Sequence, residues 1–153
     1  MTDLIIRPAT TADLPQLYAF EQGVIATERP MDPTIRDGDI HYYNLPVMMA
    51  SPDVHLLVAE RDGTLLGSAY ARIDPARHYL RHSVHAYLGF MYVEPAYRGK
   101  GVNQLIIAAL KAWALSRQLT ELRLDVYHTN TNAIRAYEKA GFTQYLLNMR
   151  MGI

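Results

Sequence analysis

The sequence predicts a mixed α/β fold, in which helices lie on the faces of one central sheet. Asp62-Gly63 lies between two apolar runs and indicates a β-hairpin, because its tight turn requires positive φ. Residues 102–117 carry apolar side chains at three- and four-residue steps, which is typical of an amphipathic helix. The expected elements follow the order β-α-α-β-β-β-α-β-α-β, which predicts a mixed sheet.

The N-terminal third is expected to hold one strand and two helices. Residues 4–6 form a short apolar run that a proline soon ends, so we expect the first strand there. Thr11 or Asp13 is expected to cap the helix that follows. Four prolines interrupt residues 29–53, so this stretch is expected to be irregular, with a short second helix in its second half.

The remaining elements follow from local patterns. Further strands are expected at residues 55–60, 65–73, 84–93, 122–127 and 142–151. A helix from near Asn132 to Ala140 precedes Gly141, which stands where a left-handed cap usually requires glycine.

The composition predicts one globular domain over residues 1–153. The formal net charge of zero argues against nucleic acid or an anionic membrane as a partner. The chain has no cysteine, which excludes disulfides, thiolate metal sites and cysteine nucleophiles, and no metal site is expected. Residues 1–4 lack a signal-peptide pattern, and no apolar run approaches the roughly 20 residues that span a bilayer, so a cytoplasmic location is expected.

A candidate anion site lies where a strand ends and the long helix begins, near Gly101. The first N–H groups of a helix are free and carry the positive end of its dipole. Gly99 and Gly101 allow the backbone to approach a diphosphate, and Arg98 and Lys100 add positive charge. The loop is no dinucleotide fingerprint, which would need glycine in place of Gln104, and it is no P-loop. The alternative interpretation is a tight turn with solvated cations.

Three segments resemble the GNAT N-acetyltransferase superfamily. Val93-x-Pro95-x-Tyr97-Arg98-Gly99-Lys100-Gly101-Val102 is similar to motif A of that family. Val126-x-x-x-Asn130-x-Asn132-Ala133-Ile134-x-x-Tyr137-Glu138-Lys139-x-Gly141-Phe142 is similar to motif B. Ile6-Arg7-Pro8-Ala9-Thr10-x-x-Asp13 resembles the family's first strand and helix. Asn103 stands where the family loop often has glycine or alanine, and its side chain is suited to bond a phosphate.

The resemblance implies a GNAT fold, with a central mixed sheet of six or seven strands flanked by about four helices. Residues 86–93 and 122–127 would be its splayed parallel strands, with acetyl-CoA, the acyl donor, in the opening between them. Their backbone would pair with the pantetheine arm, and the amides of residues 98–104 would hold the pyrophosphate. The implied cofactor-binding residues are Met91, Val93, Arg98, Gly99, Lys100, Gly101, Asn103, Gln104 and Asn130.

The implied reaction is direct attack of a primary amine on the thioester within a ternary complex. Tyr137 stands at the family's tyrosine position and is the candidate general acid for the leaving thiolate. Its alternative role is in the core, because it shares a helical face with Ala133 and Ile134. Some members carry a glutamate where this chain has Tyr87, so no base is assigned. The remaining candidates to bind the amine or take its proton are Glu28, Asp32, His85, Glu94, His128 and an ordered water.

The acceptor is the least defined part of this interpretation. Residues 26–50 are expected to form one wall of its site. Only 12 residues follow Gly141, which is room for one strand but hardly for the family's usual final hairpin. The acceptor is a small-molecule amine or a peptide or protein amine, and the alternative to an open site is a second subunit that completes it in a homodimer. The alternative function is a non-catalytic acyl-CoA-binding module.

Overall fold

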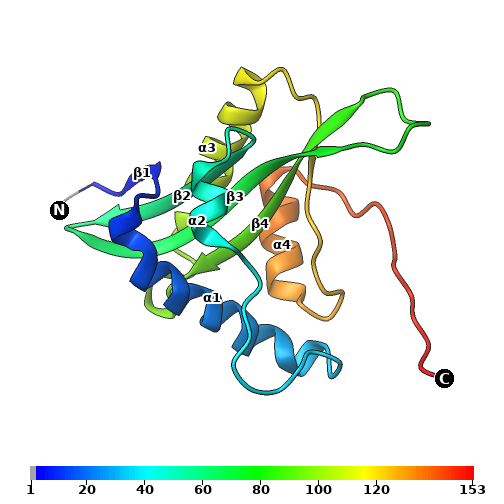
Figure 1. Cartoon of the computed structure of the whole chain (residues 1–153), viewed down its shortest axis with the longest axis horizontal. Helices are drawn as coiled ribbons and strands as arrows, with labels where there is room; N and C mark the ends of the chain where they lie inside the picture. Colours follow the sequence, from blue (N-terminus) through cyan, green and yellow to red (C-terminus); the bar gives the residue numbers. More distant parts are fainter. Residues whose placement is uncertain (1–2) are drawn as a thin grey trace.

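The computed structural model describes residues 3–153 and contains a five-stranded sheet in the order β1-β2-β3-β4-β5 (Figure 1). The strands are β1 (Ile5–Pro8), β2 (Val54–Arg61), β3 (Thr64–Pro75), β4 (Val84–Val93) and β5 (Leu122–Arg123). The α-helices are α1 (Leu14–Glu28), α2 (Leu45–Ala50), α3 (Val102–Ser116) and α4 (Thr131–Ala140). Neighbouring strands pair antiparallel except β4 and β5, which are parallel, so the predicted mixed sheet is confirmed. Met1 and Thr2, used in the signal-peptide prediction, lie outside the described residues.

Helices cover both faces of the sheet, and the side chains of β2 show how. Leu57 and Ala59 belong to the core cluster that α3 covers, whereas Leu56 and Val58 belong to the cluster that α1 and α2 cover. Successive side chains of a strand point to opposite faces, so a strand between two helical layers is apolar throughout. The strand that leads to the candidate site, β4, is thereby held from both sides.

Several local predictions are confirmed. Asp62 and Gly63 have φ of 52° and 75°, as the turn between β2 and β3 requires. Gly141 ends α4 with φ of 109°. Asp13 occupies the N-cap position of α1, as expected, but its side chain makes no capping hydrogen bond to the helix; the carboxylate instead accepts the Thr10 N–H at 2.8 Å and pairs with Arg7 at 2.8 Å.

Two predicted strands are wrong in whole or in part. Only Leu122 and Arg123 of residues 122–127 pair with β4, and residues 142–151 form no strand. Among the described residues the sheet therefore has five strands rather than six or seven. Phe142, the first residue of the tail (residues 142–153), is partly buried against the core. The apolar side chains after it have no neighbouring strand and lie exposed: Tyr145, Leu146, Leu147, Met149, Met151 and Ile153.

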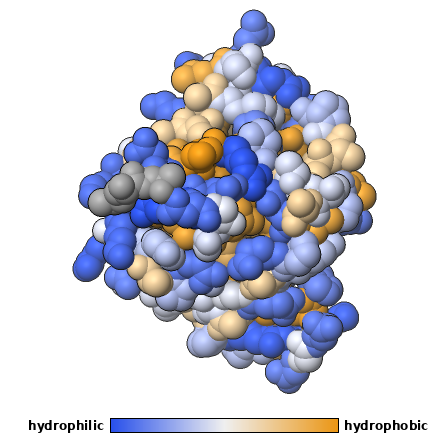
Figure 2. All heavy atoms as spheres, turned by 90° about the vertical axis from the view of Figure 1, so that its left-hand side faces the viewer, coloured by the Kyte–Doolittle hydropathy of each residue, from blue (hydrophilic) through white to orange (hydrophobic). Residues whose placement is uncertain are grey.

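The opposite side of the molecule differs from the tail. On the side that carries β1, hydrophilic residues dominate and apolar residues form separate small patches (Figure 2). Within residues 3–153, no helix combines the length and the apolar character that crossing a membrane requires.

Candidate active site

The centre of the candidate site is the opening between β4 and β5. The two parallel strands pair only at Ala86 with Leu122 and at Tyr87 with Arg123. Beyond this point β4 continues to Val93, still paired with β3, whereas residues 124–127 leave the sheet. The predicted splayed pair is therefore present, and the edge of β4 that faces away from β3 is open after Tyr87.

A β-bulge in β4 lies at this opening. The pairing with β3 shifts between Ser68–Tyr92 and Tyr70–Gly89, which leaves one extra residue in β4. Phe90 takes the left-handed conformation with φ of 54°, and its buried carbonyl accepts the Ser68 hydroxyl at 3.2 Å. A bulge bends its strand and strengthens the local twist. The end of β4 is thereby turned away from residues 124–127.

The loop after β4 leads directly into α3. A 3-10 turn, Pro95–Tyr97, is followed by Gly99 and Gly101 with φ of 73° and 83°. A Cβ built on either glycine would meet no atom within 4 Å, so the surface above the loop is open. The first N–H groups of α3, which begins at Val102, have no partner within the helix, and no side chain caps them. The arrangement suits a diphosphate held by backbone amides.

The side chains predicted to contact the cofactor have different surroundings. Arg98 Nε donates to the Val93 carbonyl at 2.9 Å, and Gln104 Nε2 donates to the Ala136 carbonyl at 3.1 Å, which ties α3 to α4. These two side chains are thus engaged within the protein. Asn103 Oδ1 is buried without a hydrogen-bond partner among the described residues.

The remaining predicted residues lie on both sides of the opening. Met91 and Val93 are on β4, beside and after the bulge. Asn130 caps α4, since its Oδ1 accepts the Ala133 N–H at 3.3 Å. Tyr137 is on α4 and packs edge-on against Phe142, with ring centroids 5.9 Å apart. Burial, followed by the nearby charge of Glu28, raises the pKa of Tyr137 to about 12.

Glu28, at the C-terminal end of α1, is the carboxylate whose charge raises the pKa of Tyr137. Burial raises the pKa of Glu28, and the Tyr42 hydroxyl donates to its Oε2 at 3.4 Å. After burial, the Glu28 charge is the next cause that raises the pKa values of Tyr42, Tyr127 and Tyr137. Tyr42 lies in the acceptor segment, which is residues 26–50. Tyr127 lies in residues 124–127, which leave the sheet, and Tyr137 lies on α4. Glu28 therefore lies among the three parts of the chain that surround the opening.

Asp32 is held in a different way. Its carboxylate accepts the Thr34 hydroxyl and binds Arg150 of the tail, both at 2.6 Å, and it accepts the Tyr127 hydroxyl at 3.2 Å. The hydrogen bonds from Thr34, followed by that from Arg150, keep the pKa of Asp32 well below its usual range. Asp32 is thus an ionised group that other residues already neutralise.

The other candidate bases are positioned less favourably. Tyr87 donates to Asp125 at 3.1 Å, and burial raises the pKa of Tyr87 far above neutrality. His85 is buried at the start of β4, the end away from the loop that leads into α3, and burial lowers its pKa. The structure gives His128 no contact that favours a role as base. The link between Asp32 and Arg150 was not predicted, because no sequence signal relates residues 118 positions apart.

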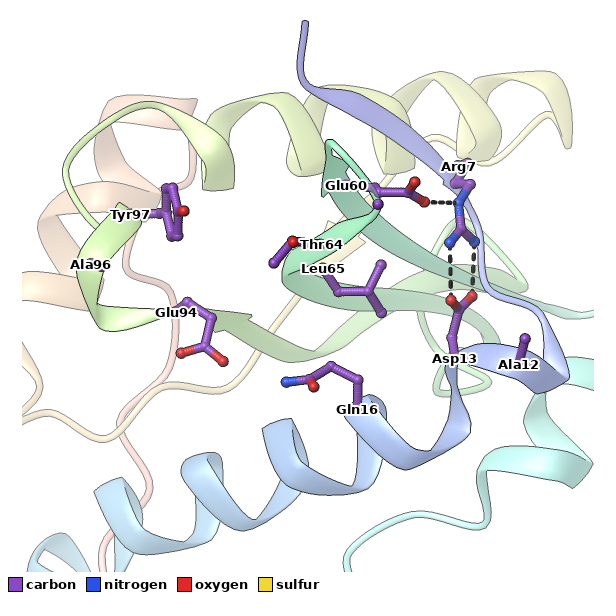
Figure 3. Close-up of a pocket in the computed structure, with 11 residues that line it drawn as sticks. Arg7, Ala12, Asp13, Gln16, Glu60, Thr64, Leu65, Glu94, Ala96 and Tyr97 are labelled. Carbon is purple, nitrogen blue, oxygen red and sulfur yellow. Dashed lines mark hydrogen bonds and ion pairs between the residues drawn. The ribbon is translucent and has the colours of Figure 1, made fainter. Parts of the chain in front are cut away.

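Glu94 lines a separate pocket (Figure 3). Arg7 lies in the same pocket and binds both Asp13 and Glu60. Carboxylates therefore outnumber cations among these residues, so the pocket is unsuited to a pyrophosphate. Tyr137 does not line this pocket.

The geometry agrees with comparisons to known proteins. The sequence profile of the acetyltransferase (GNAT) family matches residues 16–142. The chain belongs to this family, as its motifs predicted.

Individual relatives share parts of the sequence. An aminoglycoside N(6')-acetyltransferase type 1 of Klebsiella aerogenes is 33% identical over 96 residues, which cover 63% of each chain. A streptothricin acetyltransferase of Escherichia coli is 47% identical over 51 residues, 33% of this chain and 29% of that one. The chain thus matches less than two thirds of the length of these relatives.

A solved structure shares the fold over nearly the whole chain. It is a protein from Clostridium acetobutylicum, described as a predicted acetyltransferase and solved with acetyl-CoA. It superimposes with a TM-score of 0.75 over 98% of this chain and 96% of that one, at 16% identity. The predicted fold class is therefore confirmed, apart from the number of strands.

Proposed function

We propose that this chain is an N-acetyltransferase that transfers the acetyl group of acetyl-CoA to a primary amine. The observation that carries this proposal is the juxtaposition of the opening after Tyr87, the amide-rich loop at one end of β4, and Tyr137 with Glu28 beside the opening. Family membership supports the same reaction.

The donor would bind with its pyrophosphate over the amides of residues 98–104 and its pantetheine arm along the open edge of β4. The carbonyl of Val93 already accepts a hydrogen bond from Arg98, so the backbone at Met91 is the better partner for the pantetheine amides. Asn130, engaged as the cap of α4, would shape the opposite wall. We expect the side chains of Lys100 and Asn103 to supplement the backbone contacts.

The reaction would proceed by direct attack within a ternary complex. The amine nitrogen forms a bond to the thioester carbon, and the bond from that carbon to sulfur then breaks. Tyr137 is protonated at neutral pH because its pKa is about 12, so its hydroxyl is available to donate to the departing thiolate. The proton released by the amine would pass through a water to Glu28, the half-buried carboxylate on the acceptor side.

The acceptor would be a small cationic amine. Glu28 is the group that favours this class, because a partly desolvated carboxylate gains from pairing with an ammonium ion. Asp32 is less suited, since Arg150 already neutralises it. Two relatives are named as acetyltransferases of aminoglycosides and of streptothricin. Antibiotics with several amino groups are therefore the first compounds to test.

We also propose that the protein forms a homodimer through its tail, residues 142–153. The exposed apolar side chains of the tail and the outer edge of β5 are both without a partner strand among the described residues. Arg150 holds the tail at Asp32, so a second subunit that packs on the tail would lie beside the acceptor segment. This arrangement would add a second wall to the acceptor site.

An amine panel tests the enzymatic proposal. Release of free CoA from acetyl-CoA would be measured with aminoglycosides, streptothricin-like compounds, polyamines and peptide N-termini. We expect turnover with at least one small cationic amine. CoA binding in calorimetry without turnover of any amine would instead favour the non-catalytic acyl-CoA-binding module.

A further inference from the structure

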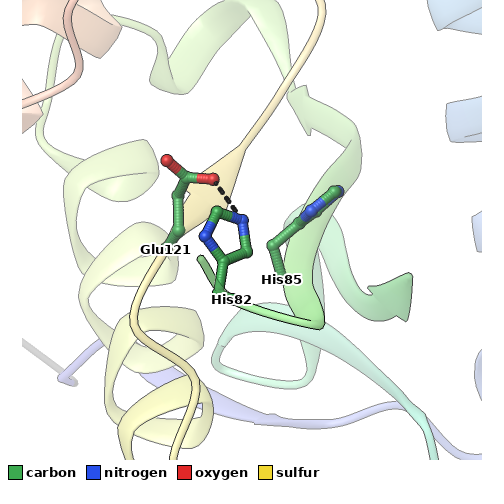
Figure 4. Close-up of side chains that lie close together, drawn as sticks. All are labelled: His82, His85 and Glu121. Atoms are coloured by element: carbon green, nitrogen blue, oxygen red, sulfur yellow. Dashed lines mark ion pairs between the residues drawn. The ribbon is translucent and has the colours of Figure 1, made fainter. Parts of the chain in front are cut away.

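His82, His85 and Glu121 lie close together outside the proposed active site (Figure 4). His82 is in the loop before β4, His85 is in the first half of β4, and Glu121 immediately precedes β5. One potential ligand atom from each residue lies within 4.8 Å of the others. His82 Nε2 approaches Glu121 Oε2 at 3.0 Å. Three groups that bind metals in proteins are thus brought together at the start of β4 and β5.

Two imidazole nitrogens of this cluster are buried without hydrogen-bond partners. His85 is only 9% exposed, and its Nδ1 has no partner among the described residues. His82 Nε2 is also without one, because the contact with Glu121 lacks hydrogen-bond geometry. Buried polar atoms are normally satisfied, so each such atom needs an explanation. A cation between the three side chains would satisfy both nitrogens.

We propose that His82, His85 and Glu121 form a Zn²⁺ site. Two imidazole nitrogens and one carboxylate oxygen are ligands that Zn²⁺ commonly takes, with a water as the fourth ligand. The hard cations Mg²⁺ and Ca²⁺ prefer oxygen ligands and fit this set poorly. Side-chain rotations would bring the three ligand atoms to the separations of a tetrahedral site.

Arg123 is the competing cation. Its Nε donates to the same Glu121 oxygen at 2.7 Å, and its guanidinium lies against the ring of Tyr145. A ligating carboxylate commonly keeps such an outer partner, which orients it toward the metal. Zn²⁺ would therefore bind the Glu121 oxygen that Arg123 does not hold, and Arg123 would remain in place.

The site would clamp the parallel strands where their pairing begins. Ala86 pairs with Leu122, and each of these residues directly follows a proposed ligand in the chain. The loop proposed to bind the pyrophosphate, between β4 and α3, is at the opposite end of β4. The ion would therefore stabilise the strands rather than take part in acetyl transfer. This proposal does not depend on the proposed function.

Calorimetry with ZnCl₂ alone tests the site, on full-length protein that is free of an affinity tag and treated with a chelator. We expect one Zn²⁺ per chain, and a Co²⁺ complex with the absorption bands of tetrahedral coordination. His82→Asn and His85→Asn are each expected to weaken Zn²⁺ binding by about 100-fold. His78→Asn and His128→Asn serve as matched controls and are expected to bind as wild type.

Circular dichroism without metal would show whether each variant is folded. If His85→Asn unfolds, the more exposed His82→Asn carries the test. Absence of saturable Zn²⁺ binding by the wild type would overturn the proposal. So would undiminished binding by folded His82→Asn, or an equal loss in the His78 and His128 controls.

Discussion

At the scale of single residues, Tyr137 has properties of both of the roles that the sequence left open. It packs against Phe142, as a core residue does, and it is near the charge of Glu28. The hydroxyl is protonated at neutral pH, as an unshifted tyrosine also is, so the raised pKa agrees with both roles. Packing and chemistry are therefore separable in this side chain, because its ring serves the first and its hydroxyl the second.

Tyr137→Phe separates these roles experimentally. Removing the hydroxyl is expected to lower kcat by about 100-fold or more, because the thiolate loses its proton donor. CoA affinity and thermal stability are expected to change little, since the ring remains. Steady-state kinetics, calorimetry with CoA and thermal unfolding would be compared. Unchanged kcat would contradict the assignment of Tyr137 as general acid.

Glu28→Gln tests the acceptor-binding carboxylate. Loss of the charge is expected to reduce kcat/KM for a cationic amine by about 10- to 100-fold. A matched control is Glu94→Gln, which lies in the other pocket and is expected to leave kcat/KM unchanged. An equal loss in both variants would show that Glu28 has no specific role.

The pH dependence of Glu28 gives a second measurement. Burial raises its pKa in the folded protein, so the charge is lost as pH falls through a value above the usual range. At the acidic end, kcat/KM is therefore expected to fall more steeply in the wild type than in Glu28→Gln. Because folding disfavours the ionised form, the carboxylate costs stability above its unfolded-state pKa. Glu28→Gln is accordingly expected to unfold at a slightly higher temperature near neutral pH.

At the scale of secondary-structure elements, the sequence predicts best what local patterns determine. Residues close together in the sequence determine three of these features: the Asp62-Gly63 turn, the apolar stripe of α3 and the Gly141 cap. By contrast, the length of β5 depends on how far β4 runs beside it, and that pairing stops at Tyr87, before the bulge at Phe90. The hydrogen bond from Ser68 to Phe90 that holds the bulge joins residues 22 positions apart, so no local sequence pattern predicts it.

The same distinction applies to the candidate site. The loop between β4 and α3 and Tyr137 could be named as candidates from the sequence because they belong to contiguous motifs. The sequence identified Glu28 only as one of several candidates to bind the amine or take its proton. Its position near tyrosines from three segments exists only in the folded protein. The sequence contains the groups but not the environment that changes their pKa values.

The loop between β4 and α3 can be tested as an element. Gly101→Glu places a strained, negatively charged side chain over the free amides, so we expect CoA binding to weaken by at least about tenfold. Gly38→Glu is a matched control, because Gly38 has φ of 84° and Gly101 has 83°, with open space above both. Calorimetry with CoA would be compared. Equal affinities in both variants would contradict the pyrophosphate site.

At the scale of the whole molecule, the tail is the feature that a monomer explains least. Leu146 and Met149 are 79% and 83% exposed, although the body of the protein has two well-buried core clusters. A contiguous exposed apolar segment usually marks an interaction surface. The tail is also held at two points, by Tyr145 against Arg123 and by Arg150 on Asp32, and the segment between them is extended.

A homodimer through this strip predicts that its polar variants are monomeric. Replacing Leu146 and Met149 together by Glu would place charges in the proposed interface, and light scattering after size exclusion is expected to give half the wild-type mass. Leu115→Glu is the matched control, because Leu115 is an exposed leucine on α3, outside the tail. It is expected to remain dimeric. A wild type that is monomeric at micromolar concentration would contradict the dimer, and the acceptor site would then be complete within one chain.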